Sequence, residues 1–279
     1  MPAIGYYNGK LGPLDEMTVS MNDRAVYFGD GCYEALIAIG QKPFALAAHL
    51  DRFYENAAAL DIPFPLSREA LETELLRCLS KADEPRAVLY WQASRGTANR
   101  THAFLYESPP NLMITVTPRK AEPDRALTLV TAEDVRYGMC DVKTLNLLPN
   151  VLLNDRARRA GADGAILVRD GIVTEGTHTN VHLLKDGALY THPADRRILA
   201  GVTRGIVLDL SRQLGVSVSE TAFPAEALFT ADEVFVTSSV LGIRRVSRID
   251  GVSVGGKAQD AFDAIQNAYQ QRFFRETDA

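Results

Sequence analysis

Two stretches in the first third of the chain have the apolar spacing of an amphipathic helix. The spacing predicts a helix over residues 49–60, with one apolar stripe and charged residues beside it. That stripe consists of Leu50, Phe53, Ala57 and Leu60. A second helix is predicted over residues 67–80, because Ser67 is a favourable N-cap and acidic residues follow in the first turns, where the helix dipole favours them.

Short apolar runs predict strands around these helices. A turn at residues 29–31, Gly-Asp-Gly, leads into a predicted strand that ends before Pro43. Residues 87–94 and 111–118 are predicted to form two more strands, separated by a polar loop.

Strand and helix patterns alternate in the second half of the chain. Helices are predicted at 151–161, 202–215 and 257–273, and glycines follow the first two where C-terminal caps are expected. The predicted strands are 126–131, 142–148, 164–171, 180–187 and 233–239. Asp-Gly turns at 170–171 and 186–187 favour hairpins, so the pattern predicts an α+β protein rather than a doubly wound parallel sheet.

A break in the pattern suggests two domains. The segment Pro-Arg-Lys-Ala-Glu-Pro at 118–123 has two prolines, charge and no apolar periodicity. We therefore expect a smaller N-terminal α/β domain over 1–118, a linker at 119–123 and a larger C-terminal domain over 124–279. A length of 279 residues is sufficient for two such domains.

Composition and charge narrow the function classes. Apolar residues make up 46% of the chain and charged residues 23%, as in globular proteins. A net charge of −5 argues against nucleic-acid binding, while a local pocket for one small anion stays possible. The sequence indicates neither a signal peptide nor a membrane-spanning helix, and its three scattered cysteines suit a reducing compartment, so we expect a cytoplasmic protein that does not bind membranes. The spacing of its cysteines and histidines matches no metal-binding motif, so we expect no metal site.

Two residues could carry acid–base chemistry. Lys143 lies in an apolar run, where burial would lower its pKa and make it a nucleophilic amine. A lysine that extends to the surface from a strand explains the same pattern. Glu175 precedes a glycine and could act as a base, an ion-pair partner or a simple turn acceptor.

Other residues could bind anions. Gly201-Val-Thr-Arg opens an apolar-periodic helix, so the Val202 and Thr203 amides and the Thr203 hydroxyl could hold a phosphate, although a capping threonine would have the same sequence. Ser239 follows a strand and could be a further phosphate contact or part of a serine-rich turn. Arg52, on the first predicted helix, could supply the guanidinium that balances a dianion. Arg100 and His102, two residues apart in a loop, could clamp a carboxylate or could be two polar residues of an exposed loop.

Taken together, these segments resemble the class IV pyridoxal-phosphate aminotransferases. The resemblance spans nearly the whole chain. Its motifs, in the family's order, are YFGDGCYE, HLDRFYENA, SRGTANRTHAF, DVKTLNLLPNVL, RDGIVTEGTHTNV, LYTHP, ILAGVTR and EVFVTSS. It implies fold type IV, with a mixed, barrel-like sheet and helices in the larger domain, and pyridoxal 5′-phosphate as the cofactor.

The resemblance also implies roles for individual residues. Lys143 matches the Schiff-base lysine, and Glu175 matches the carboxylate that pairs with the pyridinium nitrogen. Arg52, Val202, Thr203 and Ser239 match the phosphate cup, Ser239 in place of a threonine. His178 stands where small residues are usual in the family.

Within the family, the substrate-binding residues resemble those of D-amino-acid transaminases. Tyr33, Arg100 and His102 match the residues that hold the substrate α-carboxylate. The resemblance implies a homodimer in which Arg100 and His102 reach the site of the neighbouring subunit. We therefore expect ping-pong transamination between a D-amino acid and a 2-oxo acid.

Three alternatives remain from the sequence. A branched-chain or broad L-aminotransferase, or an aminodeoxychorismate lyase, would use the same fold and cofactor. A non-catalytic binding protein is the alternative from a different class, and the suitable residue at each mapped cofactor position disfavours it.

Overall fold

The computed structural model describes residues 3–104 and 108–278, which group into two compact units. Unit 1 comprises the described residues up to Ala121, together with 142–146 and the chain end from Phe273. Unit 2 comprises Glu122–Asp141 and Leu147–Arg272. The predicted boundary at 119–123 stays a prediction, and the grouping differs from it by placing Lys143 in unit 1.

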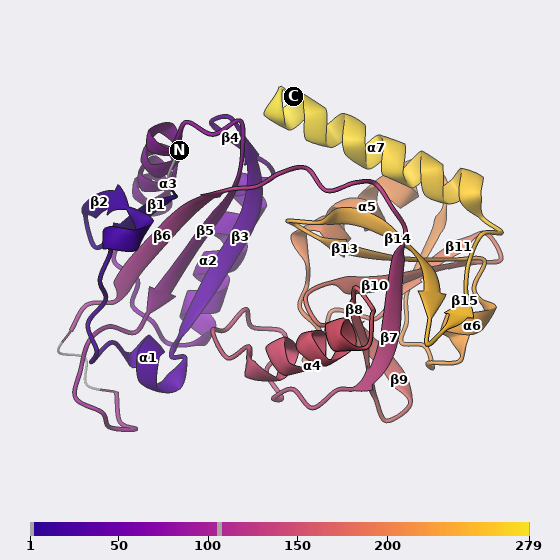
Figure 1. Ribbon diagram of the computed structural model, residues 1–279, viewed down its shortest axis with the longest axis horizontal. Helices are drawn as coiled ribbons and strands as arrows, with labels where there is room; N and C mark the ends of the chain where they lie inside the picture. The colour runs from indigo at the N-terminus through magenta and orange to yellow at the C-terminus, as the bar shows by residue number, and fades with distance from the viewer. Residues whose placement is uncertain (1–2, 105–107, 279) are drawn as a thin grey trace. The chain divides into compact units, whose positions relative to one another are not determined.

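Unit 1 is built on an antiparallel sheet. In the part of the chain that the structure describes, this sheet has six strands in the order β2-β1-β6-β5-β3-β4. The strands are β1 (Ile4–Tyr7), β2 (Lys10–Pro13), β3 (Gly31–Ile39), β4 (Lys42–Pro43), β5 (Arg86–Ser94) and β6 (Asn111–Pro118). Figure 1 shows the long strands β3, β5 and β6 side by side.

The helices of unit 1 form one apolar core with this sheet. Helix α2 (Leu46–Ala59) packs on β3, and α3 (Arg68–Ala82) packs on β6 and β1. Trp91, Leu89 and Ile114 from the sheet and Phe53, Leu71 and Leu75 from the helices are fully buried in this core. The turn η1 (Leu14–Glu16) and the short helix α1 (Arg24–Phe28) precede β3.

Local sequence accounts for the ends of these helices. The Ser67 hydroxyl accepts a hydrogen bond from the Ala70 amide and caps α3, as predicted. Helix α2 begins three residues earlier than predicted, directly after Ala45, whose φ of 55° is left-handed. The apolar stripe therefore located the helix but did not mark its start.

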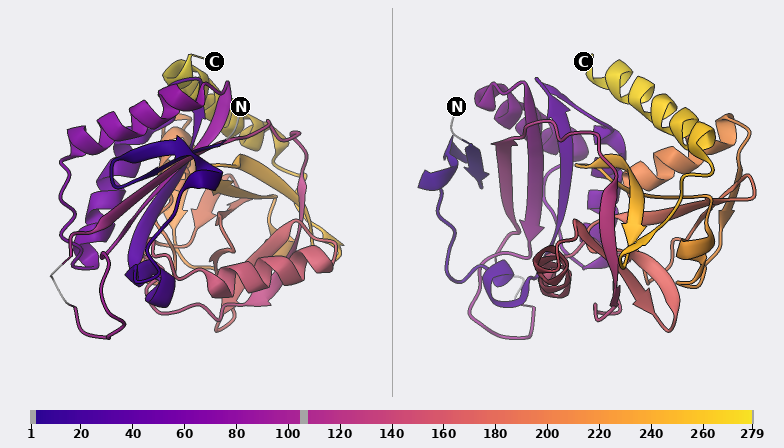
Figure 2. Two further views of the ribbon diagram at one scale, coloured as in Figure 1. Left: turned by 60° about the vertical axis from the view of Figure 1, so that its left-hand side comes forward. Right: turned by 45° about the vertical axis from the view of Figure 1, so that its right-hand side comes forward.

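Unit 2 is built on a mixed sheet. Its described strands follow the order β12-β11-β10-β13-β14-β7-β8-β9, with β15 paired to β14; the pairs β12-β11, β14-β7 and β7-β8 are parallel, and the other pairs are antiparallel. They are β7 (Leu127–Glu133), β8 (Gly164–Arg169), β9 (Ile172–Gly176), β10 (Asn180–Lys185), β11 (Ala188–Thr191), β12 (Ser217–Glu220), β13 (Glu233–Ser238), β14 (Gly242–Ile249) and β15 (Val252–Ser253). Figure 2 shows that these strands twist and curl rather than lie flat.

Four helices accompany this sheet in the described residues: α4 (Leu148–Arg159), α5 (Val202–Gln213), α6 (Ala227–Thr230) and α7 (Gln259–Thr277). Helix α4 packs on β8, and α5 packs on β12 and β13. The predicted turns at Asp170-Gly171 and Asp186-Gly187 have positive φ at both residues, as two-residue hairpins require. The α+β prediction is confirmed.

One predicted strand is wrong. Residues 142–148 do not form a strand; the segment up to Leu147 is irregular, and helix α4 begins at Leu148. Only an isolated bridge between Thr144 and Cys32 and two flanking backbone hydrogen bonds join it to β3. Residues 142–148 therefore pair with β3 at one position only, which is too little to form a strand of the sheet.

The core of unit 1 yields a stability prediction. Replacing the fully buried Leu75 with alanine should lower the free energy of unfolding of unit 1 by about 2–5 kcal/mol, through lost burial and the cavity that remains. Trp91, the single tryptophan, lies in the same core, so its fluorescence during urea unfolding reports on this unit. Leu214→Ala, at a leucine that is 45% exposed in unit 2, should leave that transition unchanged. An equal shift for both variants would contradict this view of the core.

Candidate active site

Residues 142–146 are fixed to the start of strand β3. The Tyr33 amide donates to the Lys143 carbonyl at 3.0 Å, and the Leu145 amide donates to the Gly31 carbonyl at 3.1 Å. A Cβ at Gly31 would collide with the Ala93 carbonyl oxygen of β5 and with the Leu145 side chain, so the close packing at this point requires glycine. The backbone of Lys143 is therefore anchored although the segment is not a strand.

The Lys143 side chain lies over an aromatic pair. Its Nζ is 4.1 Å from the centre of the Tyr33 ring, and Tyr33 stacks on Tyr90 with centroids 5.5 Å apart. Lys143 is half-buried rather than enclosed in a core. The cation–π contact restricts the ammonium group to the face of Tyr33.

The next residue of β3 points to the opposite face of the sheet, because side chains alternate along a strand. Glu34 is fully buried there and accepts hydrogen bonds at 2.7 and 2.8 Å from Arg52 on α2. The His49 Nδ1 lies 2.6 Å from the same carboxylate. Burial opposes the charge of Glu34, but the Arg52 and His49 side chains outweigh it and lower its pKa to about 2. Sequence reasoning singled out Arg52 and missed its buried partner.

Arg100 and His102 are both exposed and contact the same ring. The Arg100 guanidinium lies 5.3 Å from the centre of Phe28, and the His102 ring packs edge-on against Phe28 with centroids 5.5 Å apart. The structure therefore brings the two predicted carboxylate-binding residues together on one surface loop.

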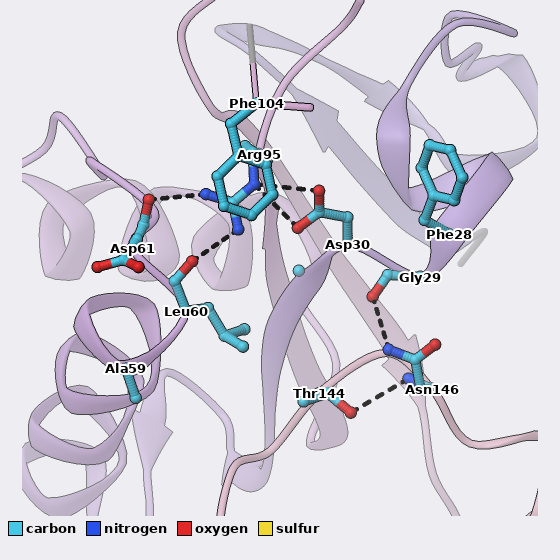
Figure 3. A pocket seen from close by; sticks show the side chains of 11 residues that line it. Phe28, Gly29, Asp30, Ala59, Leu60, Asp61, Arg95, Phe104, Thr144 and Asn146 are labelled. Atoms are coloured by element: carbon cyan, nitrogen blue, oxygen red, sulfur yellow. Dashed lines mark hydrogen bonds and ion pairs between the residues drawn. The ribbon is translucent and has the colours of Figure 1, made fainter. Parts of the chain in front are cut away.

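A pocket of about 360 Å³ lies close to this loop in unit 1 (Figure 3). Arg95 fills part of it and is fully engaged: Nε donates to Asp30, and the two terminal nitrogens donate to the Leu60 and Asp61 carbonyls. The Phe104 ring covers this guanidinium at 3.6 Å. The other lining residues are Phe28, Gly29, Gly31, Ala59, Thr144 and Asn146.

In unit 2, Glu175 is held by three donors. Its carboxylate, on β9 and 7% exposed, accepts hydrogen bonds at 3.1 Å from the Asn180 amide group and from the Leu199 backbone amide. Arg136 donates to the other oxygen. These bonds fix the orientation of the carboxylate.

Arg136 was not predicted from the sequence. It also pairs with Asp134 through Nε at 2.8 Å, and Thr174 donates to Asp134 at 2.9 Å. Burial opposes the charge of Asp134, but Arg136 outweighs it and lowers the pKa of this carboxyl to about 2. The sequence offers one signal for this residue: Asp134-Val-Arg136 follows a predicted strand, and Arg136 lies seven residues before Lys143. This spacing alone does not reveal that Arg136 pairs with Glu175.

Helix α5 begins where the phosphate contacts are predicted. Gly201 is its N-cap, and within the described residues no side chain caps it. The alternative that Thr203 merely caps this helix is therefore wrong, since Thr203 is its second residue and is buried. A Cβ at Gly201 would collide with the Asn180 Oδ1, so the helix start and the Glu175 network pack directly together. First-turn amides and a hydroxyl at this point suit a phosphate dianion.

The remaining predicted positions are less informative. Ser239 is half-buried in the turn after β13. His178 is exposed, and its Nδ1 lies 3.1 Å from the Thr177 hydroxyl. Cys32 and Cys78 are buried free thiols, and the Cys140 thiol donates to the Tyr137 carbonyl. In the described part of the chain no helix has the length and apolar character needed to span a membrane.

Comparison with known proteins decides the family. The model of the family described as amino-transferase class IV matches residues 31–249. The chain belongs to this family. It is accordingly a pyridoxal-phosphate-dependent aminotransferase, as the sequence motifs predicted.

The similar proteins include D-alanine aminotransferases and a branched-chain aminotransferase. D-alanine aminotransferase of Bacillus licheniformis is 36% identical over 275 residues, 97% of each chain. The protein of the same name from Listeria monocytogenes is 37% identical over 268 residues, 94% of this chain and 93% of the relative. In structure, the branched-chain amino acid aminotransferase of Escherichia coli has a TM-score of 0.89 at 23% identity, and the match covers 98% of this chain and 95% of that one. The chain therefore has the fold of the type IV aminotransferases.

The buried cluster of Glu34, Arg52 and His49 yields a prediction for stability at acid pH. An unfolded glutamate titrates near 4.5 and folded Glu34 near 2, so its stabilising contribution is complete above pH 4.5 and is lost as the pH falls toward 2. Glu34→Gln leaves Arg52 without this carboxylate and should be less stable near neutral pH, with a gap to wild type that narrows on acidification. Trp91 fluorescence in urea, from about pH 6 to about pH 2.5, measures the gap.

Glu55→Gln is the matched control, because Glu55 is an exposed residue of α2, the helix that carries Arg52. Its stability should run parallel to that of wild type at every pH. A Glu34→Gln gap that stays constant with pH would contradict the ionised, paired state of Glu34.

Proposed function

We propose that this aminotransferase transfers the amino group of a D-amino acid to a 2-oxo acid by a ping-pong mechanism. The observation that carries the proposal is the paired placement of Arg100 and His102 on one exposed loop against Phe28. An arginine and a histidine two residues apart offer N–H donors that suit the α-carboxylate that every amino acid substrate presents. The D-alanine aminotransferases that share 36–37% identity with this chain support the choice of D-substrates.

The donor set fits pyridoxal phosphate. We assign its phosphate to the Val202 and Thr203 amides and to the Thr203 and Ser239 hydroxyls. We add Arg52, whose guanidinium also pairs with Glu34 through Nε and Nη2. The uncapped start of α5 supports this assignment. We assign its ring nitrogen to Glu175, which two neutral donors and Arg136 hold in place.

When bound, the cofactor supplies an electron sink for the pair left at Cα after proton loss and carries the amino group between the two substrates. Lys143 is its covalent attachment point in our proposal. With the cofactor bound, the Lys143 amine would remove the proton from the substrate Cα as a general base. The Lys143 Nζ lies 4.1 Å from the centre of the Tyr33 ring, which holds the side chain in place. The Glu175 carboxylate would hold a proton at the ring nitrogen of the cofactor.

We also propose that the active protein is a homodimer in which Arg100 and His102 serve the neighbouring subunit. Their exposure leaves them available to a partner. Val26 and Tyr27, next to Phe28 on α1, are 59% and 39% exposed, which suits a contact surface.

Half-reactions test the proposed substrate class. The holoenzyme is mixed with D-alanine or with L-alanine in the absence of a 2-oxo acid, and the cofactor spectrum and the pyruvate formed are followed. We expect D-alanine to convert the cofactor and to yield one equivalent of pyruvate, with L-alanine much slower. Conversion by L-amino acids alone would replace the proposal with an L-aminotransferase, the second candidate, which the likeness to a branched-chain enzyme solved with pyridoxamine 5′-phosphate favours.

The covalent role of Lys143 has a direct chemical test. Borohydride reduction of the holoenzyme, followed by peptide mass spectrometry, should place the added phosphopyridoxyl mass on the peptide that contains Lys143. Lys143→Ala should remain folded, lose this label and lose transamination by orders of magnitude, because it removes both the attachment point and the base. Lys120→Ala changes an exposed lysine of unit 1 and should behave as wild type. A label elsewhere, or near-normal turnover of Lys143→Ala, would refute the assignment.

A further inference from the structure

A buried arginine holds the backbone of the loop that carries Arg100 and His102. Arg24, the first residue of α1, is 5% exposed. Its Nη1 donates to the Thr101 carbonyl at 2.8 Å and lies 3.4 Å from the Ala103 carbonyl. The two carbonyls flank His102, so one guanidinium fixes the backbone on both sides of that histidine.

A single carboxylate fixes Arg24 in turn. Asp30, in the Gly-Asp-Gly turn, accepts from the Arg24 Nε at 2.7 Å and from the Arg95 Nε at 3.0 Å. Arg95 holds the next part of the loop, because its guanidinium lies 3.6 Å from the centre of the Phe104 ring. The Asp30 turn therefore anchors the loop through two arginines, one at the backbone and one at a side chain.

The same cluster sets the position of the side chains that face outward. The Phe28 ring lies 4.9 Å from the Arg24 guanidinium, and it also contacts Arg100 and His102. Arg24 thus braces both the loop backbone and the ring against which the two exposed side chains rest. None of these contacts involves a group that reacts.

We propose that Arg24 is the positioning residue for substrate carboxylate binding: it holds the loop in the conformation in which Arg100 and His102 converge on the α-carboxylate of the amino acid. This inference rests on the proposed function. Arginine is required because its planar fork reaches Asp30 and the loop carbonyls in different directions at once, which a lysine ammonium on a flexible stem cannot reproduce.

The test compares Arg24→Lys, Arg100→Ala and wild type in the first half-reaction with D-alanine. We expect Arg24→Lys to raise the half-saturating concentration of D-alanine roughly tenfold or more, in the direction of Arg100→Ala, with the limiting rate within about threefold of wild type. Cofactor affinity and spectrum should be unchanged. A merely structural role would lower the fraction of active enzyme, hence the amplitude, without moving half-saturation.

Arg77→Lys is the matched control, an arginine on the exposed face of α3 that pairs with Glu74. Asp30→Asn is a second variant in case Arg24→Lys does not fold; it keeps Arg24 and withdraws the anion that holds it, so half-saturation should rise as well. The half-saturating concentration of D-alanine could stay at the wild-type value in Arg24→Lys and Asp30→Asn while Arg100→Ala raises it. That result would overturn the role of Arg24 and leave the proposed function standing. A wild-type enzyme that does not react with D-alanine would overturn the proposed function, and this inference with it.

Discussion

The anchoring of residues 142–146 to the first residues of β3 is the constraint on which the candidate site depends. Two backbone hydrogen bonds join the segments, one to the Lys143 carbonyl and one from the Leu145 amide. They bring a lysine from the middle of the chain onto unit 1, over the ring of Tyr33. Gly31 permits the approach because a side chain there would meet the neighbouring strand. A segment without regular structure is thereby placed as firmly as a strand residue.

Buried carboxylates paired with arginine recur in both units. Glu34 pairs with Arg52 and Asp30 with Arg24 and Arg95 in unit 1, and Arg136 joins Asp134 to Glu175 in unit 2. Removing one partner of such a pair leaves an uncompensated charge in a poorly solvated position, which is costly, so each pair fixes its neighbours in one arrangement. The aminotransferase must bind two anionic groups, a phosphate and a carboxylate. These ion pairs therefore also decide which arginine side chains are held by protein carboxylates and which face outward.

Much of the fold was predictable from the sequence because periodicity and turn chemistry are local. The apolar stripe of α2, the Ser67 cap and the Asp-Gly hairpins each follow from a few neighbouring residues. Strands such as β1, β2, β12 and β14 were not predicted; the first three have four residues each and are stabilised by their partners rather than by a pattern of their own. The strand predicted at residues 142–148 was wrong because only Thr144 forms a bridge to β3, and the run ends in the exposed Leu147 and Leu148 at the start of α4.

The site divides in the same way. Motifs single out Lys143, Glu175, Thr203, Arg100 and His102, because cofactor chemistry requires those residue types within short segments, and their roles stay predictions. Arg136, Glu34 and Arg24 were missed because their partners lie far away in sequence or their role is to hold a backbone carbonyl. Asp30 was visible only as part of a turn, although it fixes two arginines. Long-range pairing of charges is information that a single sequence does not display.

The most direct measurement of the central claim is exchange of the Cα proton of alanine with solvent deuterium, followed by NMR in the presence of pyridoxal phosphate and without a 2-oxo acid acceptor. We expect exchange of D-alanine by the wild-type enzyme, little exchange of L-alanine, and loss of the D-alanine exchange in Lys143→Ala. Exchange of D-alanine at the same rate in the Lys143→Ala variant would contradict this expectation.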